Sequence, residues 1–149
     1  MNASLLVHHW QVCDAAKTHV SFAHAHAVRG THRRERDRSF VSLRDAVQAL
    51  TSARETVDPG EAPVSPTSAW GASLEQQSAL ELVAGRAERY VTACERYQRL
   101  GVGRAARDEA LVALCRALDI VTFYRNGPQV KEVTPDAALP ARTSEGSRP

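Results

Sequence analysis

The sequence predicts an all-α protein, a four-helix bundle built from two helical hairpins and followed by a flexible C-terminal tail. Hydrophobic residues make up 43% of the 149 residues, enough for the core of one domain. Aromatic residues make up only 5%, and alanine and leucine dominate the apolar set, which favours closely packed helices over a sheet. All seven prolines fall outside two long blocks, 4–58 and 67–127, so each block predicts a helical hairpin.

The first block predicts two helices that meet near Gly30. In the first helix, apolar residues recur every three or four positions once Lys17 is allowed as a polar member: Leu6, Trp10, Cys13, Val20 and Ala27. The second helix continues this spacing with Arg54 as its exception: Phe40, Leu43, Val47, Leu50 and Val57. Asp58-Pro59-Gly60 ends it. The alternative is that both helices form a single kinked rod.

The second block carries the most regular pattern of the chain. A third helix is predicted by six residues at spacings of three and four: Leu80, Val83, Ala87, Tyr90, Cys94 and Tyr97. Ser73 and Gln76 form a capping-box pattern at its start, and Gly101 and Gly103 close its end. A broader apolar face predicts a fourth helix that Asn126-Gly127-Pro128 terminates: Ala110, Leu111, Leu114, Cys115, Leu118 and Val121.

The connections define the domain organisation. Short links at 30 and 101–103 and a longer proline-rich crossing at 58–72 predict one helical-bundle domain over 1–125. Trp70 is expected to order the crossing, because its ring is costly to leave in water. Residues 126–149, with further prolines and small polar residues, predict the flexible tail.

The cysteines and the apolar runs predict a cytoplasmic protein. Cys13, Cys94 and Cys115 are odd in number and far apart, which argues against a disulfide framework and favours reduced thiols. The N-terminus lacks the basic and apolar regions of a secretory signal. No apolar stretch approaches the roughly 20 residues that cross a bilayer, so no membrane partner is expected.

The segment 32–38 is the most informative feature, because it holds Arg33, Arg34, Arg36 and Arg38 although the formal net charge of the chain is only +2. Planar guanidinium groups match phosphate oxygens two at a time and stay charged. Because Arg36 falls on the apolar line of the second helix, we expect this segment to overhang the bundle as a free helical end or a loop. The alternative is a solvated junction balanced by neighbouring acids, and a GC-rich genome produces the same preference for arginine over lysine.

A second arginine set lies on the third helix, away from its apolar seam: Arg86, Arg89, Arg96 and Arg99. Arg104 and Arg107 extend this set into an arginine ridge. Three acids at heptad spacing border this set and favour intrahelical ion pairs as the alternative: Glu81, Glu88 and Glu95. Glu-Arg-Tyr occurs at both 88–90 and 95–97. This repeat predicts either a stacking platform for unpaired bases, core tyrosines with hydroxyls at the rim, or a contact between protomers.

No pattern in the sequence indicates catalysis or a cofactor. All six histidines lie in the first 32 residues, and only His9 and Cys13 have a spacing that suits two metal ligands on one helix face. Third and fourth ligands are missing from the pattern, so we expect no metal site. Phosphate-loop, zinc-protease and nucleophile-elbow motifs are absent, so we expect no enzyme.

A small helical chain with these arginine sets resembles the small subunit of class 1 CRISPR effector complexes over residues 4–125. The resemblance implies a subunit, present in several copies beside other subunits, that holds single-stranded RNA or DNA by its phosphates. It implies backbone contacts from both arginine sets: Arg33, Arg34, Arg36, Arg38, Arg86, Arg89, Arg96 and Arg99. The near-neutral charge departs from what a lone binder needs. The alternative function is a protein-interaction or self-assembly module that uses the 80–97 seam and Trp70.

Overall fold

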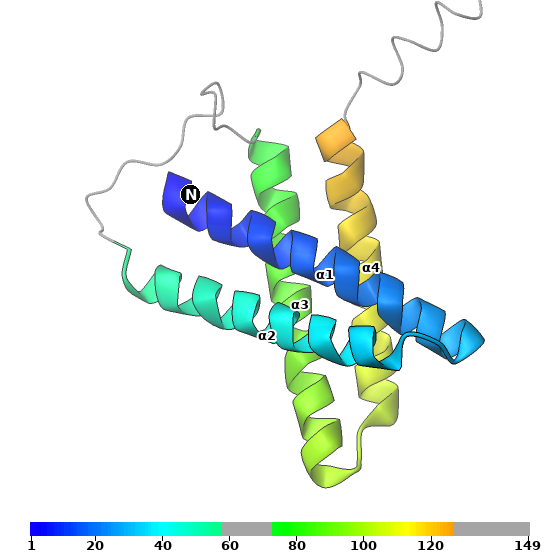
Figure 1. The fold of residues 1–149 in the computed structure, drawn as a ribbon. Helices are drawn as coiled ribbons and strands as arrows, with labels where there is room; N and C mark the ends of the chain where they lie inside the picture. The colour runs from blue at the N-terminus through cyan, green and yellow to red at the C-terminus, as the bar shows by residue number, and fades with distance from the viewer. Residues whose placement is uncertain (58–72, 127–149) are drawn as a thin grey trace, which may run out of the picture.

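The computed structural model describes residues 1–57 and 73–126, which form four helices and contain no strand. The helices are α1 (Ala3–Arg29), α2 (Arg33–Glu55), α3 (Leu74–Leu100) and α4 (Arg104–Asn126). Each hairpin pairs two consecutive helices, and the two hairpins cross one over the other (Figure 1). The predicted all-α fold of two hairpins is therefore confirmed. Because α1 and α2 fold back on each other, the kinked-rod alternative is wrong.

Local sequence signals fix the helix ends. The side chain of Asn2 caps α1, and Gly30 ends it in the left-handed conformation with φ of 69°. The capping box predicted for Ser73 and Gln76 is present in full at the start of α3. Gly101 ends α3 with φ of 70°, a conformation that costs any residue with a Cβ. The predicted crossing with Trp70, and the tail from residue 127, lie outside the described residues.

The core lies between the hairpins and within each of them. The α3 seam is confirmed, with five of its six residues at most 6% exposed: Leu80, Val83, Ala87, Tyr90 and Cys94. Leu43, Val47 and Leu50 face it from α2, and Leu114, Leu118 and Val121 face it from α4. Because this seam is buried inside one chain, it is not open to a partner helix.

The buried line of α1 differs from the prediction in its second half. Leu6 and Cys13 are buried as expected, but the line then continues through Ala16 and His19, whereas Ala27 is exposed. An apolar pattern misses this line because one of its members is a polar ring. His19 can be buried there because both of its ring nitrogens form hydrogen bonds in the core, to Ser39 and to Tyr90.

Candidate functional site

A cleft of about 520 Å³ lies where the two hairpins cross, and all four helices contribute to its lining. Its charged lining residues come from α2 and α4: Arg36, Asp37, Arg44, Arg104, Arg107 and Asp108. His19 and His26 line it from α1, and Tyr90 and Tyr97 line it from α3. The cleft is therefore both cationic and aromatic.

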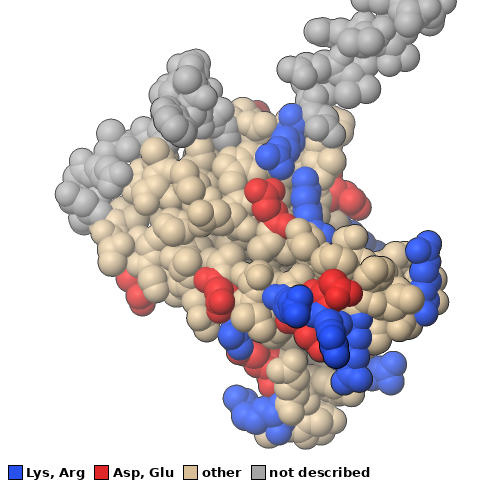
Figure 2. Space-filling model, in the orientation of Figure 1, with Lys and Arg blue, Asp and Glu red and all other residues tan. Residues whose placement is uncertain are grey.

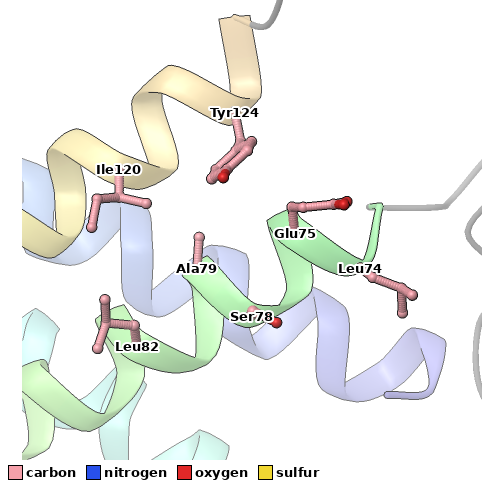
Figure 3. A pocket seen from close by; sticks show the side chains of 7 residues that line it. All are labelled: Leu74, Glu75, Ser78, Ala79, Leu82, Ile120 and Tyr124. Carbon is pink, nitrogen blue, oxygen red and sulfur yellow. The ribbon is translucent and has the colours of Figure 1, made fainter.

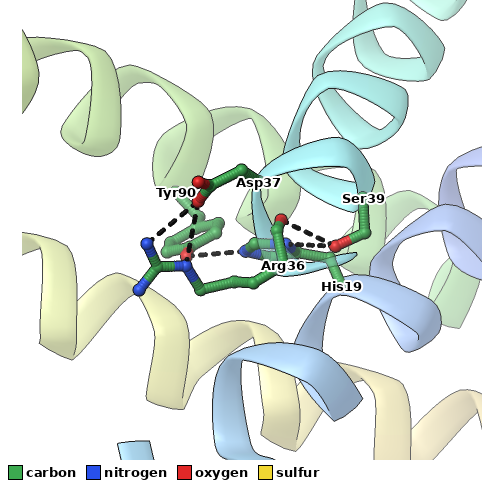
Figure 4. Close-up of polar contacts among 5 residues, drawn as sticks. All are labelled: His19, Arg36, Asp37, Ser39 and Tyr90. Carbon is green, nitrogen blue, oxygen red and sulfur yellow. Dashed lines mark hydrogen bonds and ion pairs between the residues drawn. The ribbon is translucent and has the colours of Figure 1, made fainter. Parts of the chain in front are cut away.

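A buried polar chain through His19 holds three helices together at one end of the cleft (Figure 4). The Nδ1 atom of His19 lies 3.0 Å from Oγ of Ser39, and its Nε2 atom lies 2.9 Å from the hydroxyl of Tyr90. Oγ of Ser39 in turn donates to the carbonyl oxygen of Arg36 at 2.8 Å. The chain thus links α1 to α2 and to α3.

The hydrogen-bond partners define the tautomer of His19. A serine hydroxyl has one proton, and Ser39 donates it to the Arg36 carbonyl, so Ser39 accepts from Nδ1–H of His19. Nε2 of His19 then accepts from the hydroxyl of Tyr90. Every donor and acceptor of this chain is satisfied when His19 is neutral.

Burial sets the protonation of these groups. Desolvation lowers the pKa of His19 to about 4, and it raises the pKa of the Tyr90 hydroxyl and of the neighbouring Cys94 thiol. All three groups are therefore neutral near pH 7. Because the proton of Ser39 points to a carbonyl and not to His19, the Ser39–His19 pair lacks the geometry of an activated nucleophile.

Three cleft arginines share a local arrangement. Arg-Asp occurs three times in the chain, at 36–37, 44–45 and 107–108, and the arginine of each dipeptide lines the cleft. Nε and Nη2 of Arg36 both donate to Oδ1 of Asp37, at 3.1 and 2.9 Å. Arg107 and Asp108 repeat this geometry with the same distances. The aspartates orient these guanidinium groups without burying them.

Arg107 also contacts an aromatic ring. Its guanidinium carbon lies 4.6 Å from the ring centroid of Tyr97, within the range of a cation–π contact. Burial acts to lower the pKa of Arg107, but the hydrogen bond and the charge of Asp108 outweigh it and raise that pKa. Arg107 is thus held in a charged and fixed position at the wall of the cleft.

The predicted arginines of α2 lie at the exposed start of that helix. Arg33, Arg34 and Arg38 are exposed and have no ion-pair partner among residues 1–57 and 73–126. Arg36 differs, since its side chain is 32% exposed, pairs with Asp37 and lines the cleft. The segment is helical and not a loop, but it overhangs the bundle only in part, because Arg36 packs into the cleft.

The start of α2 lacks a side-chain cap. His32 occupies the N-cap position with φ of 60° and ψ of 33°, and no side chain accepts from the first helical N–H groups. His32 is the only described non-glycine residue with positive φ, and its Nδ1 atom lies 3.2 Å from Oε1 of Glu35. The helix end therefore presents open backbone donors beside arginine side chains.

The α3 arginines lie on the outer surface of the second hairpin. Arg89, Arg96 and Arg99 are exposed and Arg86 is half-buried. The alternative of intrahelical ion pairs between these arginines and the heptad-spaced glutamates is wrong, because no ion pair joins two residues of α3 in the described chain. Of the eight predicted arginines, the structure brings only Arg36 into the cleft.

The two Glu-Arg-Tyr repeats have different environments. Tyr90 is 5% exposed and its hydroxyl is bonded to His19, so its ring is closed to a base. Tyr97 is half-buried beneath Arg107. The core-tyrosine interpretation therefore holds for the ring of Tyr90, but its hydroxyl bonds to buried His19 and does not reach the rim. The stacking platform of two tyrosines is wrong, because the ring of Tyr90 is buried.

The metal-ligand spacing of α1 lies inside the core. His9 and Cys13 are 2% and 0% exposed. Nδ1 of His9 lies 2.7 Å from the carbonyl oxygen of Leu5, and its Nε2 atom lies 3.3 Å from Nη2 of Arg54. Within residues 1–57 and 73–126, no three His, Cys, Asp or Glu side chains are grouped to hold a metal ion.

An apolar groove of about 370 Å³ lies between the start of α3 and the end of α4 (Figure 3). Its exposed lining includes Leu74, Leu82, Ile120 and Tyr124, with exposures between 37% and 66%. The groove is separate from the cleft, because the two share no lining residue.

Comparison with known protein families, curated proteins and solved structures finds no match for this chain. The resemblance to CRISPR small subunits therefore stays a prediction. None of the four described helices is long and apolar enough to cross a membrane.

Sequence reasoning missed His19 and Arg44, and it placed Arg104 and Arg107 on a surface ridge and not in a cleft. His19, Arg44, Arg104 and Arg107 are brought together only by the crossing of the hairpins, which spacing along one helix does not show. The repeated Arg-Asp dipeptide is the signal that was available.

Proposed function

We propose that this protein is a non-catalytic helical subunit that holds a single nucleic-acid strand by its phosphates within a multi-subunit ribonucleoprotein. One observation carries the proposal: positive charge is concentrated in two segments of the chain, and each of them contributes residues to the cleft at the crossing of the hairpins. Segments 33–45 and 86–109 hold eleven arginines and seven carboxylates, an excess of four positive charges, although the formal net charge of the chain is +2. The remainder of the chain has an excess of two negative charges.

The structure gives this charge a location. Lysine and arginine side chains gather over the start of α2 and over the adjoining ends of α3 and α4, whereas the surface over the start of α1 and the end of α2 is mostly uncharged (Figure 2). Both charged segments border the same cleft. A strand that reaches this cleft meets arginines from α2 and α4.

The state of the side chains supports phosphate binding. Arg33, Arg34 and Arg38 are exposed and unpaired within the described residues, so no carboxylate must be displaced before they bind. The uncapped N-terminus of α2 adds backbone N–H donors and the positive end of the helix dipole. An anion at this position offsets the cost of placing cations at a helix start.

The proposal places the subunit in the cytoplasm, in several copies beside other subunits. Three free cysteines, of which Cys13 and Cys94 are buried, suit a reducing compartment. A modest excess of charge is enough for a subunit that shares its strand with neighbours. RNA and DNA offer the same phosphates, so the proposal does not choose between them.

Salt dependence of strand binding tests the proposal. We expect the full-length protein to bind a labelled, 5′-hydroxyl single strand, and the logarithm of affinity to fall with the logarithm of salt concentration. If about four phosphates are neutralised, the slope is roughly −3. Fluorescence anisotropy over a salt series measures it.

Two matched double variants separate local from total charge. Arg34→Glu with Arg38→Glu should weaken binding and flatten the slope, because two phosphate contacts are lost. Lys17→Glu with Arg116→Glu changes the net charge by the same amount outside the two basic segments. Equal loss of affinity in both variants, or a complex that does not respond to salt, would contradict the proposal.

A self-assembly module is the second candidate, and the apolar groove of α3 and α4 is the observation that favours it. Leu74 and Ile120 are 66% and 42% exposed there. Light scattering distinguishes the candidates: a stable oligomer that Ile120→Glu dissociates, and that shows no affinity for a strand, would favour self-assembly over strand binding.

A further inference from the structure

We propose that the cleft at the crossing of the hairpins is a binding site for a phosphomonoester, either a free nucleoside monophosphate or the 5′-phosphate end of a strand. This site is distinct from the exposed arginines of α2 and α3, because none of them lines the cleft. The proposal therefore does not depend on strand binding by the outer surface.

The charge of the lining selects this class of ligand. Four guanidinium groups and two carboxylates line the cleft, and these six side chains together give an excess of two positive charges. A phosphomonoester carries about −1.5 to −2 charges at pH 7 and three acceptor oxygens. A phosphodiester carries only one negative charge, so it would neutralise only one of the two excess positive charges of the lining.

The donors come from both hairpins. Arg36 and Arg44 lie eight residues apart on α2, and both side chains line the cleft. Arg104 and Arg107 line it from α4. The bonds to Asp37 use two of the five N–H groups of Arg36, and those to Asp108 use two of the five of Arg107. Three N–H groups on each remain for an anion that bridges the hairpins.

The cleft is also preorganised and large enough. Its volume of about 520 Å³ falls within the range of roughly 300–1,000 Å³ that is usual for small-molecule sites. Aspartates orient Arg36 and Arg107, and Tyr97 supports Arg107 from the ring face. Half-buried Phe40 and Leu111 supply apolar wall for the organic part of the ester.

Calorimetric titration with two matched pairs of probes tests this site. Adenosine 5′-monophosphate is compared with adenosine, and a 5′-phosphorylated eight-nucleotide strand is compared with its 5′-hydroxyl form. We expect the phosphate to raise affinity at least roughly tenfold in one pair or in both. A gain in the first pair identifies a free nucleotide as ligand, and a gain in the second identifies a strand end.

Cleft variants locate the gain. The double variant Arg104→Gln with Arg107→Gln should remove the gain in affinity. Arg104→Gln alone should reduce the gain, and it should not disturb folding because the Arg104 side chain is 76% exposed. Lys17→Gln with Arg116→Gln, outside the cleft and outside the predicted strand contacts, should leave the gain intact. The inference is overturned if neither pair shows a gain, or if the gain survives unchanged in the folded cleft variants.

These outcomes are separable from the proposed function. If the 5′-hydroxyl strand fails to bind, the proposed strand-binding surface is wrong, while the comparison of adenosine 5′-monophosphate with adenosine still tests the cleft. If that strand binds and neither phosphate gain is seen, the cleft inference alone is wrong.

Discussion

Acidification from pH 7 to pH 5 should destabilise this protein through His19. Burial lowers the pKa of His19 to about 4 in the folded chain, whereas an unfolded histidine titrates near 6.5. As pH falls below 6.5, His19 binds a proton in the unfolded chain but stays neutral in the folded chain until the pH approaches 4. The contribution of neutral His19 to stability is therefore fully present above pH 6.5 and is lost progressively down to about pH 4.

The two pKa values give the size of this effect. Between pH 7 and pH 5 the linkage relation predicts a loss of about 2 kcal/mol in the free energy of unfolding from His19 alone. The buried chain explains why the loss is large: Ser39 and Tyr90 satisfy His19 as a neutral ring that is only 2% exposed.

Urea denaturation at both pH values measures the loss, and one substitution isolates it. His19→Gln keeps a donor and an acceptor in the core but cannot take up a proton in this pH range. Between pH 7 and pH 5, the free energy of unfolding of this variant should therefore decrease by about 2 kcal/mol less than that of the parent protein. His24→Gln, at an exposed position of the same helix, should match the parent. If parent and His19→Gln lose the same free energy between pH 7 and pH 5, the reasoning is refuted.

Three further predictions test the fold, each by urea denaturation at pH 7. Tyr90→Phe should cost about 1–3 kcal/mol because it leaves Nε2 of His19 buried without a donor, and a cost near zero would contradict the assigned bond. Leu43→Ala should cost about 2–5 kcal/mol, since Leu43 is 0% exposed between the hairpins; a smaller loss would show a loosely packed core. Gly101→Ala should destabilise by about 1–2 kcal/mol because φ is 70°, whereas Gly85→Ala, inside α3 and equally free of neighbours, should stabilise by about 0.5–1 kcal/mol; equal effects would contradict the left-handed cap.

The helices could be predicted from the sequence because their signals are local. The spacing from Leu80 to Tyr97 and the capping box at Ser73 depend on residues within a few turns of each other. Proline-free blocks likewise separate the two hairpins. The prediction failed on α1, where His19 occupies a core position that an apolar pattern assigns to Val20.

The candidate site could be predicted only in part, because it depends on how the hairpins cross. The exposed arginines of α2 follow from their density in the sequence, and the structure leaves three of them open. The cleft combines Arg36 with Arg104 and Arg107, which lie about seventy residues further along the chain. No periodicity within one helix reports such a long-range arrangement.

Chemical-shift mapping with a 5′-hydroxyl single strand tests strand binding most directly, because it locates the contact residue by residue. We predict that the amide shifts change at the start of α2, over 33–38, and on α3 and the start of α4, over 86–107. Shift changes confined to the groove around Leu82 and Ile120, or none at strand concentrations that saturate a basic surface, would contradict the account.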